Sequence, residues 1–483
     1  MNSIVSGFLF WLILSKITTP DVIGISSSII SFVTIFSIVS LVGMPGGIQR
    51  YLVRSINERK IDNVRGNINS SLFILSLGIT GSCVLIFFIK DWIFYSFSLD
   101  LGLSIILFLT MGFLSAASLL NAIMVTTMNT RIIATSSIIG TVIKLSITLI
   151  LVLSGIEVYG ILTGYLLAPL VSTVILAMTI KRKILKRVDD VAHADIKIER
   201  FKSLRDIFVS GTSFWIPGVC NIIGSQLGTV LVLLSVGATQ AGIYFISYSI
   251  ATAIILINSV LSTIAYPAVS SMDDGRKSAV WRFMKISMLL TLPLSISAIF
   301  YSGEILGLFN NIYSEGSSYL QILLLSILPT TIMSGTSVLT YAYGNNRQVL
   351  SIGLFTNIPR ILLYFVFVPL LGGIGAAFIY LLGSVIGCVV SLVIGKKIGL
   401  KVFWKKTSLI ILIPVILLIL FKFSGVHYIL SIMTTLVLTY ILFIRLKIID
   451  KEDIDDITKI LPPKISNLIS MTFMRISKQV RKR

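Results

Sequence analysis

Long apolar runs separated by short polar connectors dominate the sequence from one end to the other. Most runs are continuous over about 17 to 25 residues and lack the period of two that marks the strands of a membrane barrel. In lipid every backbone polar group must be satisfied internally, so such runs predict membrane-spanning helices. The predicted spans are 4–15, 22–44, 70–89, 101–127, 132–153, 159–180, 208–234, 241–267, 283–303, 318–341, 348–370, 374–395, 407–421 and 427–446.

The first span, 4–15, is the anomalous one. About twelve residues at a rise of 1.5 Å each cover much less than the ~30 Å hydrocarbon core. Either this helix lacks its first turns or the true start of the protein lies upstream. No basic segment precedes it and no small-residue cleavage site follows it, so we expect it to stay attached rather than to be a signal peptide.

Composition agrees with the apolar pattern. Hydrophobic residues make up 55% of the 483 positions and charged residues only 12%, and the mean hydropathy is +0.98. A water-soluble globule of this length has no means of burying that much apolar surface, so lipid must be the solvent. The predicted class is therefore an all-α polytopic membrane protein with about fourteen transmembrane helices.

The formal net charge of +20 would suggest a nucleic-acid partner in a soluble protein. A membrane protein instead concentrates Lys and Arg in its cytoplasmic loops, so we expect no nucleic-acid partner. With a cytoplasmic N-terminus, the outer loops hold only Lys16, Lys90 and Lys422. This asymmetry predicts a multi-pass protein of the plasma membrane with both termini cytoplasmic. The inner segments hold Arg50, Arg54, Arg59, Lys60, Arg65, Arg131, the cations of 181–205, Arg276, Lys277, Arg282, Lys285, Arg347, Lys396, Lys397, Lys401, Lys405, Lys406 and those of 445–483.

Lys144 and Arg360 fall near the middle of apolar spans. A cation at mid-bilayer costs at least ~2.5 kcal/mol, so it normally faces a protein interior or a wet cavity and has a function. The alternative is a cation that snorkels, or pairs with a helix-end carbonyl, for packing alone.

An internal repeat relates these two cations. An offset of 216 residues carries Arg131 onto Arg347 and Lys144 onto Arg360, and an offset of 215 carries Tyr165 onto Tyr380. Spans 1–6 and 7–12 thus resemble two copies of one six-helix lobe, an arrangement that builds a central site between the halves of transporters. The predicted parts are an N-terminal lobe at 1–180, a basic cytoplasmic linker at 181–206, a C-terminal lobe at 207–395, two further helices at 396–446 and a basic amphipathic tail at 447–483.

The stretch GFLFWLILSKITTPDVIGISSSIISFVTIFSIVSLVGMPGGIQRYLVRS at 7–55 resembles the polysaccharide transporters of the multidrug/oligosaccharidyl-lipid/polysaccharide exporter superfamily, the O-antigen and teichoic-acid type of flippase. The fourteen-helix plan extends the resemblance over essentially the whole chain. The resemblance implies two lobes around a central cavity, whose basic residues hold the phosphates of a polyprenyl-linked oligosaccharide, and a groove beside helices 13 and 14 for its lipid tail. Lys144 and Arg360 are the candidate cavity cations, and Arg50 and Arg54 are candidates for first contact with the head group.

Four amides are candidate polar lining of the cavity: Asn221, Gln226, Asn258 and Asn357. Each is also suited to an interhelical hydrogen bond. The predicted function is that of a flippase that acts by alternating access on a lipid-linked oligosaccharide. We expect a monomer surrounded by membrane lipids, with polysaccharide-assembly proteins as candidate partners. We expect no cofactor, metal or catalytic residue.

Two alternatives stay open. A cation-coupled multidrug extruder of the same superfamily needs an intramembrane Asp or Glu, and the spans offer none at their centres. A membrane polymerase or ligase of lipid-linked sugars needs a sizeable outer loop with catalytic groups, whereas the predicted outer loops are short.

Overall fold

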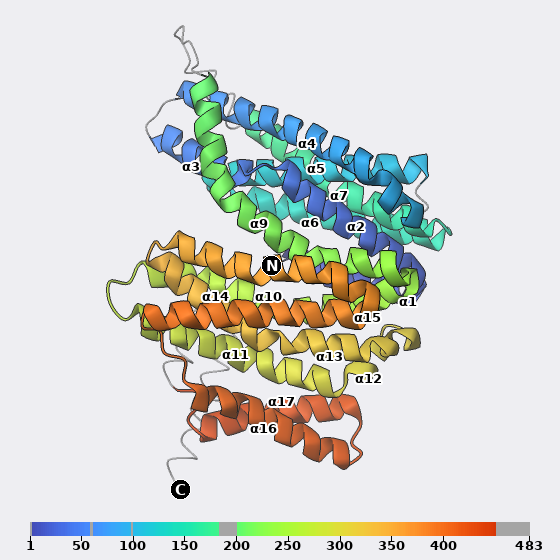
Figure 1. Cartoon of the computed structure of the whole chain (residues 1–483), viewed down its shortest axis with the longest axis vertical. Helices are drawn as coiled ribbons and strands as arrows, with labels where there is room; N and C mark the ends of the chain where they lie inside the picture. The colour runs from blue at the N-terminus through green and yellow to red at the C-terminus, as the bar shows by residue number, and fades with distance from the viewer. Residues whose placement is uncertain (1, 58–60, 98–99, 183–199, 451–483) are drawn as a thin grey trace. The chain divides into compact units, whose positions relative to one another are not determined.

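The computed structural model of the chain (Figure 1) describes residues 2–57, 61–97, 100–182 and 200–450. Regular structure in these ranges is helical throughout, which confirms the all-α class. The elements are α1 (Asn2–Ile17), α2 (Pro20–Ser40), α3 (Met44–Asn57), α4 (Ile61–Phe97), α5 (Leu101–Thr126), α6 (Thr130–Leu153), α7 (Glu157–Ile180), α9 (Arg200–Val236), α10 (Ala238–Ser270), α11 (Arg276–Phe300), α12 (Ser302–Gly307), η2 (Asn311–Gly316), α13 (Ser317–Leu325), α14 (Ile327–Ala342), α15 (Asn346–Lys397), α16 (Trp404–Phe423) and α17 (Tyr428–Arg445).

Twelve segments of the described chain are long and apolar enough to cross a membrane. One of them, α15, is broken at Gly372, whose φ of 59° and ψ of −137° are not helical, and two predicted spans lie on either side of this break. The apolar part of α1, Gly7–Ile17, is shorter than the twelve. With α15 taken as two spans and α1 as the short one, the predicted number of about fourteen agrees with the structure.

The helix α3 is an element that the hydrophobic runs did not predict, because the chain after span 2 was interpreted as a loop. Its apolar residues Met44, Ile48 and Leu52 recur every fourth position and are fully buried. That spacing places them on one helical face. They pack with residues of α4, α5 and α7 into one hydrophobic core.

The described chain forms two compact units. Unit 1 comprises Met1–Phe245 together with Asn357–Ala376, so the middle of α15 belongs with the N-terminal helices. Unit 2 comprises Ile246–Thr356 and Ala377–Arg483. The predicted lobe boundaries stay a prediction. The predicted linker at 181–206 and the predicted tail at 447–483 both lie mostly outside the described residues.

Close helix contacts in unit 1 depend on glycines. A Cβ added at Gly164 of α7 would lie 2.0 Å from Thr148 Oγ1 of α6, and one at Gly140 of α6 would lie 2.8 Å from the carbonyl oxygen of Ala168. Small residues let helix backbones approach in this way. The α6–α7 pair is therefore tightly held, and it positions the first of the predicted site residues.

In unit 2 the most enclosed helix is α11, which packs against α14, α16 and α17. The hydroxyl of Tyr440 on α17 donates to the carbonyl oxygen of Leu289 on α11 at 3.2 Å. The C-terminal helices are thus attached to this unit through α11.

Candidate substrate-binding site

Lys144 of α6 is buried inside unit 1, with 9% of its surface exposed. Its Nζ lies 4.3 Å from the ring centroid of Phe10 on α1 and 4.3 Å from that of Tyr165 on α7. Trp11 extends this aromatic group, with its ring centroid 5.8 Å from that of Tyr165 and 4.7 Å from that of Phe245. Ring faces attract a desolvated cation by about 2 kcal/mol or more.

The tight α6–α7 contact explains how Lys144 reaches these rings. A Cβ at Gly164 would lie 3.1 Å from the carbonyl oxygen of Lys144, so the backbone of Lys144 lies directly against α7. Tyr165 is the next residue along α7 and therefore meets the lysine side chain. Among the described residues, this ammonium contacts the faces of Phe10 and Tyr165, which carry no negative charge, so its positive charge is held without being neutralised.

Arg360 of α15 is also buried in unit 1, with 4% of its surface exposed. Its Nη1 donates to Oδ1 of Asn357, one turn earlier on the same helix, at 3.3 Å. Asn357 in turn lies against α9, where a Cβ added at Gly224 would come within 2.5 Å of its Oδ1. The hydroxyl of Tyr364 donates to the carbonyl oxygen of Gly224 at 3.3 Å.

Residues 357, 360 and 364 are spaced three and four apart, so they lie on one face of α15. The GxxxG pair of α9 provides the room for this face, since a Cβ at Gly228 would meet Tyr244 and Tyr364. Arg360 is thus held by an amide on a helix that packs against a glycine surface. Lys144 and Arg360 belong to the same compact unit but are positioned by different helices.

Three other predicted amides take different places. Gln226 accepts a hydrogen bond from Ser31 Oγ of α2 at 3.0 Å through its Oε1, and Asn221 is exposed on α9. Asn258 belongs to α10 in unit 2, where it is almost completely buried and donates from Nδ2 to Thr331 Oγ1 of α14 at 2.8 Å. Gln226 and Asn258 therefore make interhelical hydrogen bonds, which is the alternative to lining a cavity given for them in the sequence analysis.

Arg50 and Arg54 both belong to α3. Their side chains lie outside the described part of the structure, so their predicted contact with a head group stays a prediction.

Sequence reasoning missed the aromatic residues around Lys144. Phe10, Trp11 and Tyr165 are distributed over two helices far apart in the chain, and nothing in their spacing marks them as one group. Tyr364 was missed as well, although it lies one turn after Arg360 in an apolar run and carries the hydroxyl that such a run normally lacks.

The acidic side chains complete the electrostatic picture. Every Asp and Glu whose side chain the structure describes is exposed, and the buried charged residues of that part are cations. No group of three or more His, Cys, Asp and Glu suited to a metal ion occurs among the described residues. The interior of unit 1 is thus suited to an anion rather than to a cation.

The fold is similar to those of solved membrane transporters. The structure is similar to the lipid II flippase MurJ in an inward closed conformation, with a TM-score of 0.72 and 17% identity over 92% of this chain and 98% of that chain. An inward-facing multidrug resistance MATE family transporter of the MOP superfamily has a TM-score of 0.61 and 15% identity over 82% of this chain and 94% of that one. This chain is a multi-pass membrane protein with the flippase and transporter fold of that superfamily.

Sequence comparison gives the family. Residues 13–315 match the family described as Polysaccharide biosynthesis protein, and the chain belongs to that family. It is also 23% identical over 189 residues to a probable flippase, AglR, of Haloferax volcanii; the match spans 37% of this chain and 39% of that relative. The resemblance predicted from residues 7–55 is confirmed.

Proposed function

We propose that the protein is a flippase that moves a polyprenyl-phosphate-linked oligosaccharide from the cytoplasmic to the outer leaflet. The product serves the assembly of a cell-surface polysaccharide or glycan. Translocation proceeds by alternating access of the two predicted lobes, and the basic segments, with both termini, face the cytoplasm of a plasma membrane.

The observation that carries the proposal is the pair of buried cations in unit 1, Lys144 and Arg360. A lipid phosphate does not cross hydrocarbon unaided, so a carrier must supply fixed positive charge along the path of the head group. Ammonium and guanidinium groups meet phosphate oxygens with charge-assisted hydrogen bonds, about twice as strong as neutral ones. The ring faces of Phe10 and Tyr165 hold Lys144 in place, and the amide of Asn357 contacts Arg360.

The family and fold support the same substrate class. AglR bears the name of a probable flippase, and MurJ that of a lipid II flippase. The polyprenyl chain of the substrate remains in the surrounding lipid during transfer, since only the phosphates and sugars need a polar path.

A multidrug extruder is the second candidate, because MATE transporters share the fold. Proton or sodium coupling and binding of a cationic drug need an acidic group inside the membrane. Within the part of the chain whose side chains are described, each carboxylate is exposed. The charge of unit 1 therefore favours an anionic substrate.

The test is translocation of a fluorescent polyprenyl-diphosphate oligosaccharide by the purified protein in proteoliposomes. We expect wild type to move the lipid, and the Lys144→Ala and Arg360→Ala double variant to lose at least ~100-fold in rate, since each lost charge-assisted bond is worth about 1.5–3 kcal/mol. Insertion and monodispersity of the double variant are measured in parallel.

Two results would contradict the proposal. One is full translocation by the double variant. The other is efflux of a cationic dye by wild type that depends on a proton or sodium gradient, with no movement of the lipid-linked sugar.

A further inference from the structure

Unit 2 contains a cavity of about 410 Å³ at the ends of three helices, where α11 begins, α15 ends and α16 begins. This volume falls in the range of small-ligand sites. Five cationic side chains contribute to its lining, namely Lys277, Arg282, Lys285, Lys401 and Lys406. The transport site proposed above lies in unit 1, so this cavity is a separate feature.

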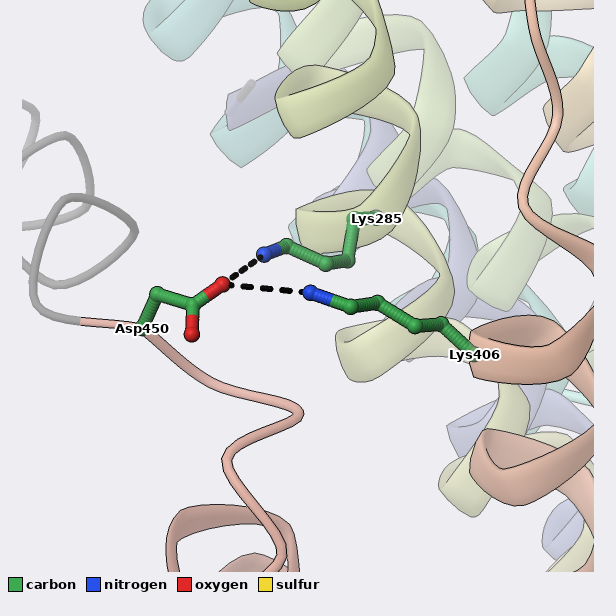
Figure 2. A network of polar contacts seen from close by, with 3 residues as sticks. All are labelled: Lys285, Lys406 and Asp450. Atoms are coloured by element: carbon green, nitrogen blue, oxygen red, sulfur yellow. Dashed lines mark hydrogen bonds and ion pairs between the residues drawn. The ribbon is translucent and has the colours of Figure 1, made fainter.

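Asp450 is the one acidic residue of the cavity lining (Figure 2). Its Oδ2 accepts from Nζ of Lys285 at 3.1 Å and from Nζ of Lys406 at 3.3 Å. Burial by itself would raise the pKa of Asp450, but the hydrogen bonds and charges of Lys285 and Lys406 outweigh it and lower that pKa. The carboxylate is therefore ionised at neutral pH, and it offsets one of the five positive charges.

The lysine at the rim of the cavity is placed by a glycine. Gly399 follows the end of α15 with a φ of 78°, and a Cβ there would lie 2.8 Å from Nζ of Lys277. Only glycine adopts this conformation at low cost. Nζ of Lys277 on α11 consequently lies against the α15–α16 connection at Gly399.

Aromatic residues place the cavity at the level of lipid head groups. The ring centroids of Trp281 and Phe403 lie 5.0 Å apart at the cavity wall, and Phe403 and Trp404 are each about half exposed. Tryptophan beside clustered Lys and Arg at helix ends is typical of the membrane–water interface. Beyond them, α16 exposes apolar side chains such as Leu412 and Ile416, a surface suited to acyl chains.

We propose that this cavity binds the phosphate head group of an anionic membrane lipid, whose acyl chains lie along α16. Lys277 and Lys401 bind the phosphate oxygens, the aromatic rings contact the glycerol region, and the lipid connects the N-terminal end of α11 with α16. Basic pockets between membrane helices select anionic lipids by this chemistry. A soluble phosphate would use the same cations, but it would gain nothing from the exposed aromatic and apolar side chains.

The experiment follows thermal unfolding of the full-length protein in detergent during titration with phosphatidylglycerol. Phosphatidylcholine is the neutral lipid, and inorganic pyrophosphate is the soluble polyanion. We expect a saturable rise of the midpoint with phosphatidylglycerol alone. The Lys277→Gln and Lys401→Gln variants should each weaken the apparent affinity about fivefold, because each cation near a membrane surface contributes about that factor.

Lys405→Gln is the matched control, because Lys405 is exposed on the same first turn of α16 and does not line the cavity. It should bind phosphatidylglycerol as wild type does. Unchanged affinity in the Lys277→Gln/Lys401→Gln double variant would overturn the site, as would an equal loss in Lys405→Gln. An equal midpoint shift with pyrophosphate would overturn the choice of a lipid. None of these readouts depends on translocation, so the proposed transport function is judged separately.

Discussion

Lys144 and Lys285 are both buried, yet the two units hold them in opposite ways. In unit 1, Lys144 lies between the rings of Phe10 and Tyr165. In unit 2, Lys285 forms an ion pair with Asp450. Aromatic faces stabilise a cation without supplying a negative charge, whereas a carboxylate compensates its positive charge.

This difference separates a charge kept for a ligand from a charge used within the protein. A buried ion pair is expensive to break but has little attraction left for a third group. A cation held by neutral partners still attracts an anion strongly, because the surroundings have a low dielectric constant. Burial alone therefore does not distinguish a cation kept for a ligand from one used within the protein. The chemical nature of its partner makes that distinction.

The largest expected effect comes from exchanging these two lysines for glutamine. Lys144→Gln should lower translocation of the lipid-linked oligosaccharide at least ~10-fold, since a charge-assisted bond to phosphate contributes about 1.5–3 kcal/mol. Lys285→Gln should leave the translocation rate within about twofold of wild type, because its charge is already engaged by Asp450. Rates in proteoliposomes with matched protein content give the comparison. Equal losses in the two variants would refute the distinction.

A smaller loss should follow from filling the space beside Asn357. In Gly224→Ala the new Cβ would start 2.5 Å from Asn357 Oδ1, so Asn357 must move and its hydrogen bond with Arg360 is lost. We expect translocation to fall about fivefold to tenfold, the range of one ordinary hydrogen bond of about 1–1.5 kcal/mol.

Gly218→Ala is the control on the same helix. A Cβ at Gly218 meets nothing within 4 Å, so this variant has the same change in helix propensity without the collision. Its translocation rate should equal that of wild type. If the translocation rate fell as much in Gly218→Ala as in Gly224→Ala, the cause would be the changed helix propensity of α9 and not a displacement of Arg360.

Removing one aromatic face from Lys144 should have a weaker effect. Phe10→Leu keeps an apolar side chain but removes one of the two ring faces over Nζ, so Lys144 loses about half of the ~2 kcal/mol of cation–π attraction. Translocation should fall about twofold to fivefold. Phe87→Leu, at a ring that is 60% exposed on α4, is the matched substitution and should leave the rate unchanged.

The sequence predicted the helices well and singled out two cations that the structure buries, because both features follow from local properties. Hydropathy locates an apolar span, and a charge at its middle is visible without any knowledge of packing. The same reasoning failed for α3, whose buried residues Met44, Ile48 and Leu52 recur at every fourth position and whose apolar residues form no run long enough for a span. An amphipathic pattern of this kind is weaker than a span, and positive charges around it suggested a loop.

The partners of the cations were not predictable, because they depend on tertiary packing. Phe10 and Lys144 lie 144 − 10 = 134 positions apart, and Lys285 and Asp450 lie 165 positions apart. The charge pattern assigns Lys285 to an inner segment, and the structure buries it within α11. Helix packing alone determines that Lys144 contacts aromatic rings and that Lys285 contacts a carboxylate.

The last prediction concerns the stability of unit 2 and not the rate of translocation. Asp450→Asn leaves the buried ammonium of Lys285 without its carboxylate, which destabilises a protein by 3–5 kcal/mol when both partners are buried. Asp450 is about half exposed, so solvent screening reduces the expected loss to about 1 kcal/mol. The measurement is the midpoint of thermal unfolding at neutral pH. Asp273→Asn, an exposed acid of the same unit, should leave that midpoint unchanged.

The pH dependence identifies the cause of this loss. Because the pKa of Asp450 is lowered in the folded protein, its contribution is present above the unfolded value near 3.8 and disappears as the pH falls through the folded value. The difference between wild type and Asp450→Asn should therefore be constant from about pH 5 to 8 and shrink below about pH 4. A difference that persisted unchanged at pH 3 would mean that packing, and not the ionised carboxylate, stabilises Lys285.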